Sequence, residues 1–193
     1  NVDGHSMPMG NGLRDLLADK FLAGECKDRT LEEVATLAEN EVGRNAVFRY
    51  VAEQVSGFSC TPGHLLLPSF RWKAIFSLNY DHLVEDAYRG FVNSSQLLKV
   101  FFKDQTAIDR EIASSLNPIP YYKLHGTIDA IYDAEAPLIL TSDTYVDFEL
   151  HRKRLFRRLE DLAYDYPIVF AGIRLTDPHI KSIIATVEKE ASS

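Results

Sequence analysis

Apolar residues recur at helical spacing through the first sixty positions of the chain. The segment GLRDLLADKFLAG predicts a helix that Asn11 can cap and Gly24 can end. A second helix is predicted to begin at Thr30, because Glu33 three residues later completes a capping box. A third apolar stripe occupies residues 47–55. The N-terminal part is therefore predicted to be helical.

Four short apolar runs after Arg71 have the composition of β-strands. They are rich in Ile, Val, Phe and Tyr, and polar or turn residues bound each of them. The runs are WKAIFSLNY (72–80), IPYYKLH (119–125), APLILTS (136–142) and DYPIVFAGI (165–173). Helical spacing lies between and after them, in DHLVEDAYRGF, TAIDREIASSL, FELHRKRLFRRLEDLA and DPHIKSIIATVEK. This alternation predicts an α/β fold with a mostly parallel sheet and helices on both faces.

Polar residues gather where each predicted strand ends. Ligands of open parallel sheets bind beyond the carboxyl ends of the strands, so these residues are candidates for one shared crevice. The candidates are Asn79 and Asp81 at the first end, His125 and Gly126 at the second, Ser142 and Asp143 at the third, and Gly172, Leu175 and Asp177 at the fourth.

Structural roles also explain several of these residues. Asp81 can cap the helix that follows it, and Asn79 can bind local backbone. Asp177 before Pro178 has the form of a helix start with no ligand at all. His125 can close a turn before a glycine, although an imidazole at a strand end is also the usual general base. The argument for chemistry therefore depends on the combination.

Two further features have plain structural interpretations. A glycine such as Gly172 at a strand end permits a close approach by backbone or phosphate, and on its own favours neither. The basic run at 151–154 is predicted to be the solvated face of an amphipathic helix.

Composition narrows the function classes. With 193 residues, 46% of them hydrophobic, the chain suits a single domain spanning 1–193. A formal net charge of -7 disfavours nucleic acid as a partner, so an anionic ligand would be held by backbone N–H groups and helix N-termini. Cys26 and Cys60 fit a reducing cytoplasm, although a disulfide between them stays open. No apolar run approaches the roughly 20 residues that cross a bilayer.

Several familiar catalytic motifs are missing from the sequence. There is no G-x-G-x-x-G, no G-x-x-x-x-G-K-[ST], no H-E-x-x-H and no G-x-S-x-G. These absences disfavour a dehydrogenase, a phosphate-loop NTPase, a zinc peptidase and a typical serine hydrolase.

In order and spacing, four segments resemble the sirtuin-like domains that act as effectors in bacterial anti-phage defence proteins. The segments are WKAIFSLNYDHLVEDA, YYKLHGTID, LILTSDTY and IVFAGIRLTDPHI. HSMPMGNGLRDLLADKF also looks like the segment that follows the family's G-A-G-x-S loop. The resemblance thus implies that the glycine-rich first strand and loop would precede Asn1, and that this chain is a fragment of the domain.

The resemblance implies a Rossmann-like sheet and NAD as the substrate. It implies a glycohydrolase that cuts the nicotinamide–ribose bond without a metal. Asn79 would hold the ribose or the water and His125 would accept a proton. Pocket roles on the NAD side fall to Asp81, Ser142, Asp143, Gly172, Leu175 and Asp177. Restraint by a homo-oligomer, a regulatory domain or a partner protein that senses phage is a further implication.

Two alternatives stay open. The crevice could bind NAD or ADP-ribose as a regulatory module without turnover, because a fold does not determine a function. A protein deacylase is the other alternative. Deacylase sirtuins add a zinc module with four cysteines, and this chain has two cysteines, so no such module is expected.

Overall fold

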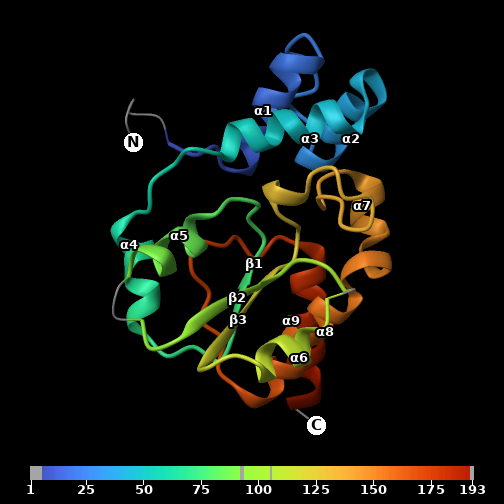
Figure 1. Cartoon of the computed structure of the whole chain (residues 1–193). Helices are drawn as coiled ribbons and strands as arrows, with labels where there is room; N and C mark the ends of the chain where they lie inside the picture. The colour runs from blue at the N-terminus through green and yellow to red at the C-terminus, as the bar shows by residue number, and fades with distance from the viewer. Residues whose placement is uncertain (1–5, 92–93, 105, 192–193) are drawn as a thin grey trace.

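The computed structural model describes residues 6–91, 94–104 and 106–191, and in these residues it contains a three-stranded parallel sheet (Figure 1). The strands are β1 (Ile75–Ser77), β2 (Leu97–Phe101) and β3 (Pro118–Lys123), in the order β1-β3-β2. Ile75 pairs with Tyr121 on one side of β3, and Leu97 pairs with Pro118 on the other. The predicted α/β class and parallel sheet are confirmed.

Two of the four predicted strands form, and a third strand lies where none was predicted. β1 falls within the run 72–80, and β3 overlaps the run 119–125 but begins one residue earlier, whereas β2 arises from LLKVF. The strand predictions for 136–142 and 165–173 are wrong. The first run is buried but joins no ladder, and Pro167–Ile173 makes no backbone–backbone hydrogen bond among the described residues.

Helices lie against both faces of the sheet. Successive side chains of β3 point to opposite faces, so each face has its own helix contacts. On one face, Lys123 contacts Glu85 of α5 (Leu83–Gly90) at 2.9 Å. On the other face, Tyr122 and Leu124 belong to a core shared with three helices. These helices are α6 (Ile108–Ala113), α8 (Phe148–Asp165) and α9 (Pro178–Ala191).

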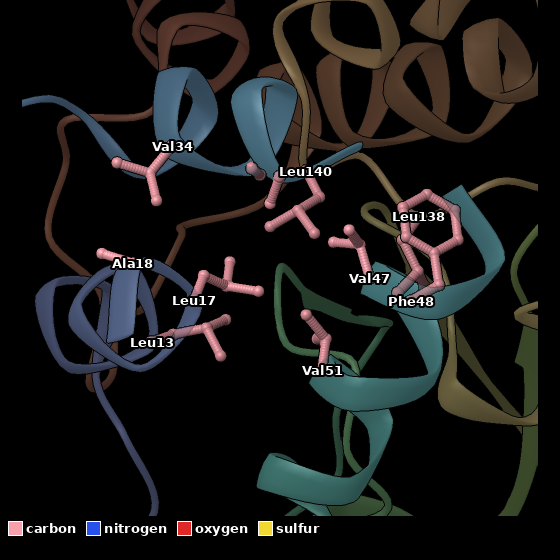
Figure 2. Close-up of a cluster of buried hydrophobic side chains, with 11 residues drawn as sticks. Leu13, Leu17, Ala18, Val34, Val47, Phe48, Val51, Leu138 and Leu140 are labelled. Atoms are coloured by element: carbon pink, nitrogen blue, oxygen red, sulfur yellow. The ribbon is translucent and has the colours of Figure 1, made fainter. Parts of the chain in front are cut away.

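The N-terminal part is helical, as predicted, and its helices lie above the sheet in Figure 1. They are α1 (Gly10–Phe21), α2 (Leu31–Val42) and α3 (Arg44–Val55). Figure 2 shows Leu17, Val34, Phe48 and neighbouring side chains converging between them. The predicted capping box at Thr30 is present, but α1 begins at Gly10, so Asn11 lies inside the helix and does not cap it.

The buried run 136–142 connects the two cores. Leu138 and Leu140 pack into the layer of N-terminal helices, whereas Ile139 between them packs against the sheet and α8. A single backbone bond, from the Ile139 amide to the His125 carbonyl at 2.9 Å, ties this run to the end of β3. This run is buried on both sides, so it has the composition of a β-strand although it forms no strand pairing.

Short elements complete the described chain. They are α4 (Pro62–Leu66), η1 (Leu67–Ser69), η2 (Ile128–Ala130) and α7 (Ser142–Val146). Cys26 and Cys60 are both free thiols, so the disulfide left open by the sequence does not form. Among the described helices, none is both long enough and apolar enough to span a membrane.

Candidate active site

The end of β3 carries a buried histidine. β3 stops at Lys123, and His125 follows two residues later with only 4% of its surface exposed. Gly126 then turns the chain with φ 99°, and its amide donates to the Lys123 carbonyl at 3.2 Å. The turn that the sequence predicted after His125 is therefore present, and it holds the imidazole inside the molecule.

The loop that carries Asn79 runs beside this histidine. Ser77 pairs with Lys123 at the end of the β1–β3 ladder, and Asn79 and His125 each follow this last pair by two residues. Two backbone bonds bracket the pair: Leu124 donates to the Ser77 carbonyl at 2.8 Å, and Ile128 donates to the Tyr80 carbonyl at 3.1 Å. The Asn79 side chain is exposed, so its amide is open to a ligand.

A fully buried lysine fixes this loop. Lys123 Nζ donates to the carbonyls of Asp81 at 2.5 Å and Tyr80 at 3.3 Å, and to Glu85 Oε1 at 2.9 Å. An ammonium group has three protons, so these contacts satisfy it completely. Lys123 thus ties the loop after β1 to the end of β3, which is the seam between Asn79 and His125.

Asp177, at the start of α9, contacts His125. His125 Nε2 lies 3.2 Å from Asp177 Oδ2, outside hydrogen-bond geometry, and both side chains are more than nine-tenths buried. The other carboxylate oxygen accepts from the Ile180 amide at 3.0 Å, which is the predicted capping bond of α9. The carboxylate therefore has one oxygen committed to its helix and one facing the imidazole.

Electrostatics keep this carboxylate ionised. Burial alone raises the pKa of the Asp177 carboxyl, but His125, the Ile180 amide and His179 together outweigh it and hold that pKa below its ordinary value. The ionised carboxylate oxygen lies 3.2 Å from the imidazole, where it can stabilise positive charge that a reaction places on the ring. The pair therefore suits a histidine that takes up a proton during a reaction.

A second histidine completes the cluster. His179 lies on the first turn of α9, and its Nε2 lies 3.0 Å from the Tyr145 carbonyl. Burial lowers the pKa of His179, and Asp177 only partly offsets this, so the ring is neutral near pH 7. Tyr145 stands between the two histidines, 5.5 Å from each in ring centroids. Burial, followed by neighbouring Tyr80 and Asp177, raises the pKa of the Tyr145 hydroxyl, so it stays protonated.

The other predicted site residues lie apart from this cluster or have structural contacts. Asp81 is 5% exposed, and its carboxylate accepts from the Leu83 amide at 2.9 Å, but the N-cap of α5 is His82, so Asp81 binds the start of the helix without capping it. Ser142 and Asp143 begin α7 and are exposed, and the Ser142 amide donates to Thr36 Oγ1 of α2 at 3.0 Å. Their ligand roles stay predictions.

The loop before Asp177 is open to solvent. Gly172 is exposed with φ 65°, and a Cβ there would meet nothing within 4 Å. Leu175 is 43% exposed. Neither residue touches the His125 cluster through a contact found among the described residues, so the fourth strand end contributes only Asp177.

A buried arginine corrects the interpretation of the basic run at 151–154. Arg152 is 1% exposed and donates from Nη2 to the Ala136 carbonyl at 3.0 Å. Burial, the largest influence, lowers the pKa of its guanidinium to about 10, so the group remains charged at pH 7. This cation lies directly over the Gly126 turn.

Replacing Gly126 by alanine should therefore lower the free energy of unfolding by more than the cost of backbone strain at this position. The positive φ alone costs roughly 1–3 kcal/mol for a residue with a side chain. The new Cβ would also lie 2.8 Å from Arg152 Nη2 and 3.1 Å from Leu138 Cδ2. Urea unfolding should show a larger loss than in Gly43→Ala, where φ is 81° but nothing lies within 4 Å. Equal losses would mean that the turn has room to adjust.

A cavity of about 260 Å³ lies between the end of α3 and the start of α5. Asp81, His82 and Asp129 line it together with the end of α3. His82 Nε2 and Asp129 Oδ2 are 2.8 Å apart at its rim. Neither Asn79 nor His125 lines this cavity, so it is separate from the histidine cluster.

Sequence reasoning missed three residues at the site: Tyr145, Arg152 and His179. His179 stands two residues after Asp177 in DPHI, which was interpreted only as a helix start. Arg152 had a signal, because it shares a helical face with Leu155, Phe156 and Leu159 at spacings of three, four and seven residues. Tyr145 carries no comparable signal.

Comparison with known proteins agrees with these motifs. The SIR2-like domain family matches residues 73–193. A protein of Enterococcus faecium named NAD(+) hydrolase ThsA is 24% identical over 162 residues, which cover 80% of this chain and 32% of that protein. A protein of the same name from Acinetobacter baumannii (strain 532279) is 26% identical over 166 residues, covering 83% and 32%. The chain thus spans about a third of the length of these relatives. Because the family match covers well over half of its residues, the chain belongs to the SIR2-like domain family.

Proposed function

We propose that this domain hydrolyses NAD at the bond between nicotinamide and ribose. The observation that carries the proposal is the buried His125–Asp177 pair, 3.2 Å apart, at the strand end beside the Asn79 loop. Two distant relatives carry the name NAD(+) hydrolase, which supports the same substrate.

The leaving group needs no acid catalysis from the protein. The electron pair of the broken bond returns to the pyridinium ring, so nicotinamide departs neutral while positive charge develops on the ribose. A water oxygen forms the new bond to the sugar, and its proton goes to His125. Asn79 fixes the ribose or the water through its amide, because positioning is the main demand of such a reaction.

Asp177 acts through His125. Its ionised carboxylate holds the imidazole in place and stabilises the protonated ring that forms when the water is deprotonated. This is a positioning role, in place of the pocket role that the resemblance implied. Asp81, Ser142, Asp143, Gly172 and Leu175 remain proposed contacts to the rest of NAD.

Incubation of the purified protein with NAD tests the proposal. Free nicotinamide, followed by chromatography, should accumulate, and Asn79→Ala should slow it roughly 10²-fold, the cost of a misplaced reactant. Asn40→Ala is the matched control, because Asn40 is an exposed asparagine on α2. NAD that binds in calorimetry but is not cleaved would favour a regulatory module. Nicotinamide released only with an acyl-lysine peptide would favour a deacylase.

A further strand from outside this sequence should complete the domain. Val169 and Phe170 are 71% and 45% exposed in an extended run without backbone–backbone hydrogen bonds among the described residues. That run starts beside β1, since Lys73 Nζ lies 5.1 Å from the centre of the Tyr166 ring. A glycine-rich strand and its phosphate-binding loop are the proposed occupant.

Restraint of such an activity is part of the proposal. An enzyme that consumes NAD harms its own cell, so we expect it to work in the cytoplasm as an anti-phage effector that stays inactive until triggered. A homo-oligomer and a regulatory domain or partner protein that senses phage would supply the restraint. The relatives are about three times as long as this chain's match, which leaves room for such a domain in them.

A further inference from the structure

Three buried side-chain atoms near the proposed catalytic histidine lack hydrogen-bond partners. They are His125 Nε2, Asp177 Oδ2 and His179 Nδ1. These three residues each offer one ligand atom that lies within 4.8 Å of the ligand atoms of the other two. Buried polar atoms are nearly always paired, so three orphans that face one point indicate a missing ligand.

The chemistry of the three atoms is that of metal ligands. Two imidazole nitrogens and one carboxylate oxygen form the ligand set of many zinc sites, with a fourth position left for water. Ligands about 2.0–2.2 Å from a tetrahedral ion lie roughly 3.3 Å apart. His125 Nε2 and Asp177 Oδ2 already meet this spacing at 3.2 Å, and the ligand atom of His179 lies within 4.8 Å of the other two ligand atoms.

Outer contacts orient the ligands as metal sites require. His179 Nε2 lies 3.0 Å from the Tyr145 carbonyl, which only an N–H can satisfy, so the Nδ1 lone pair is free. Asp177 commits its other oxygen to the Ile180 amide at 3.0 Å. His179 and Asp177 are thus each held through one side-chain atom, while the second atom is free to bind a metal.

We propose that Zn²⁺ binds His125, Asp177 and His179 and thereby inhibits the NAD hydrolysis proposed above. A neutral imidazole has one free nitrogen lone pair. If the metal takes it at Nε2, the ring proton resides on Nδ1 and neither nitrogen can accept a proton from water. A bound cation also opposes the positive charge that develops on the ribose. Metal binding and general-base action at His125 are therefore mutually exclusive.

Binding is tested on the whole chain without NAD, so it does not depend on the proposed activity. Metal-free protein titrated with zinc chloride in a calorimeter should bind one ion, and the melting temperature should rise with zinc. Co²⁺ in place of zinc should give visible d–d absorption bands typical of a site with few ligands. His179→Ala and Asp177→Asn should each weaken zinc binding at least tenfold, whereas His64→Ala should not, because His64 caps α4.

Inhibition is the second measurement. Zinc should stop nicotinamide release by the wild type, and a chelator should restore it. The turnover of His179→Ala should be the same with and without zinc, whatever its level in metal-free buffer. Zinc binding that both ligand variants leave unchanged, or no binding at millimolar zinc, overturns the site. Zinc that accelerates release overturns the inhibitory role. Zinc binding in a protein that cleaves no NAD would refute the proposed function and the inhibition while the site stands.

Discussion

Replacing His125 by alanine should lower the rate of nicotinamide release by roughly 10²–10⁴-fold, the usual contribution of a general base. His125 is buried at the end of β3 and lies 3.2 Å from the buried carboxylate of Asp177. Asp177 cannot substitute, because its pKa is held below the ordinary value and it is a weak base. The measurement is single-turnover release of nicotinamide at saturating NAD, followed by chromatography.

Folding controls separate chemistry from stability. His125→Gln keeps a polar side chain of similar size but cannot take up a proton near pH 7, so it should be as inactive as His125→Ala. His64→Ala should retain wild-type turnover, since its imidazole only caps α4. Circular dichroism and thermal unfolding should show all three variants folded. A folded His125→Ala protein with more than about a tenth of wild-type turnover would remove His125 from the mechanism.

The sequence predicted the two strand ends that form the site because both strands come from short apolar runs bounded by polar residues. β3 is buried along almost its whole length, and β1 sits beside it in register. β2 escaped prediction because it is an edge strand: Leu97 is 52% exposed and Val100 is 38% exposed, so LLKVF lacks a clear alternation. Burial alone did not decide the outcome, because the run 136–142 is buried and forms no strand.

The candidate site was predictable as far as local signals reach. His125 beside Gly126 and Asp177 before Pro178 stand at segment ends, where a sequence marks its turns. Asp177 contacts His125 because α8 and α9 pack over the sheet. The two residues are 52 positions apart in the sequence, and no hydrophobic periodicity predicts such a contact. The same folding brings His179 into the cluster. Contacts of this kind arise only from tertiary structure.

Removing the buried Lys123 ammonium should cost about 3–5 kcal/mol of stability, the usual effect of breaking a buried ion pair. Lys123→Met keeps the length of the side chain but leaves Glu85, which is 12% exposed, as an unpaired charge. The carbonyls of Tyr80 and Asp81 lose their donor as well. Urea unfolding measures the change. Because these carbonyls hold the Asn79 loop, nicotinamide release should also fall in the fraction that remains folded.

A second substitution and a surface control can isolate the cause of the loss of stability. Adding Glu85→Gln to Lys123→Met removes the orphaned charge, so the double variant should be more stable than Lys123→Met alone. Lys103→Met breaks the half-buried pair with Asp133, 2.7 Å long and about a quarter exposed on both sides, and should cost about 0–1 kcal/mol. If Lys123→Met is no more destabilising than Lys103→Met, water reaches the seam between β1 and β3. The ammonium would then not be what fixes the Asn79 loop.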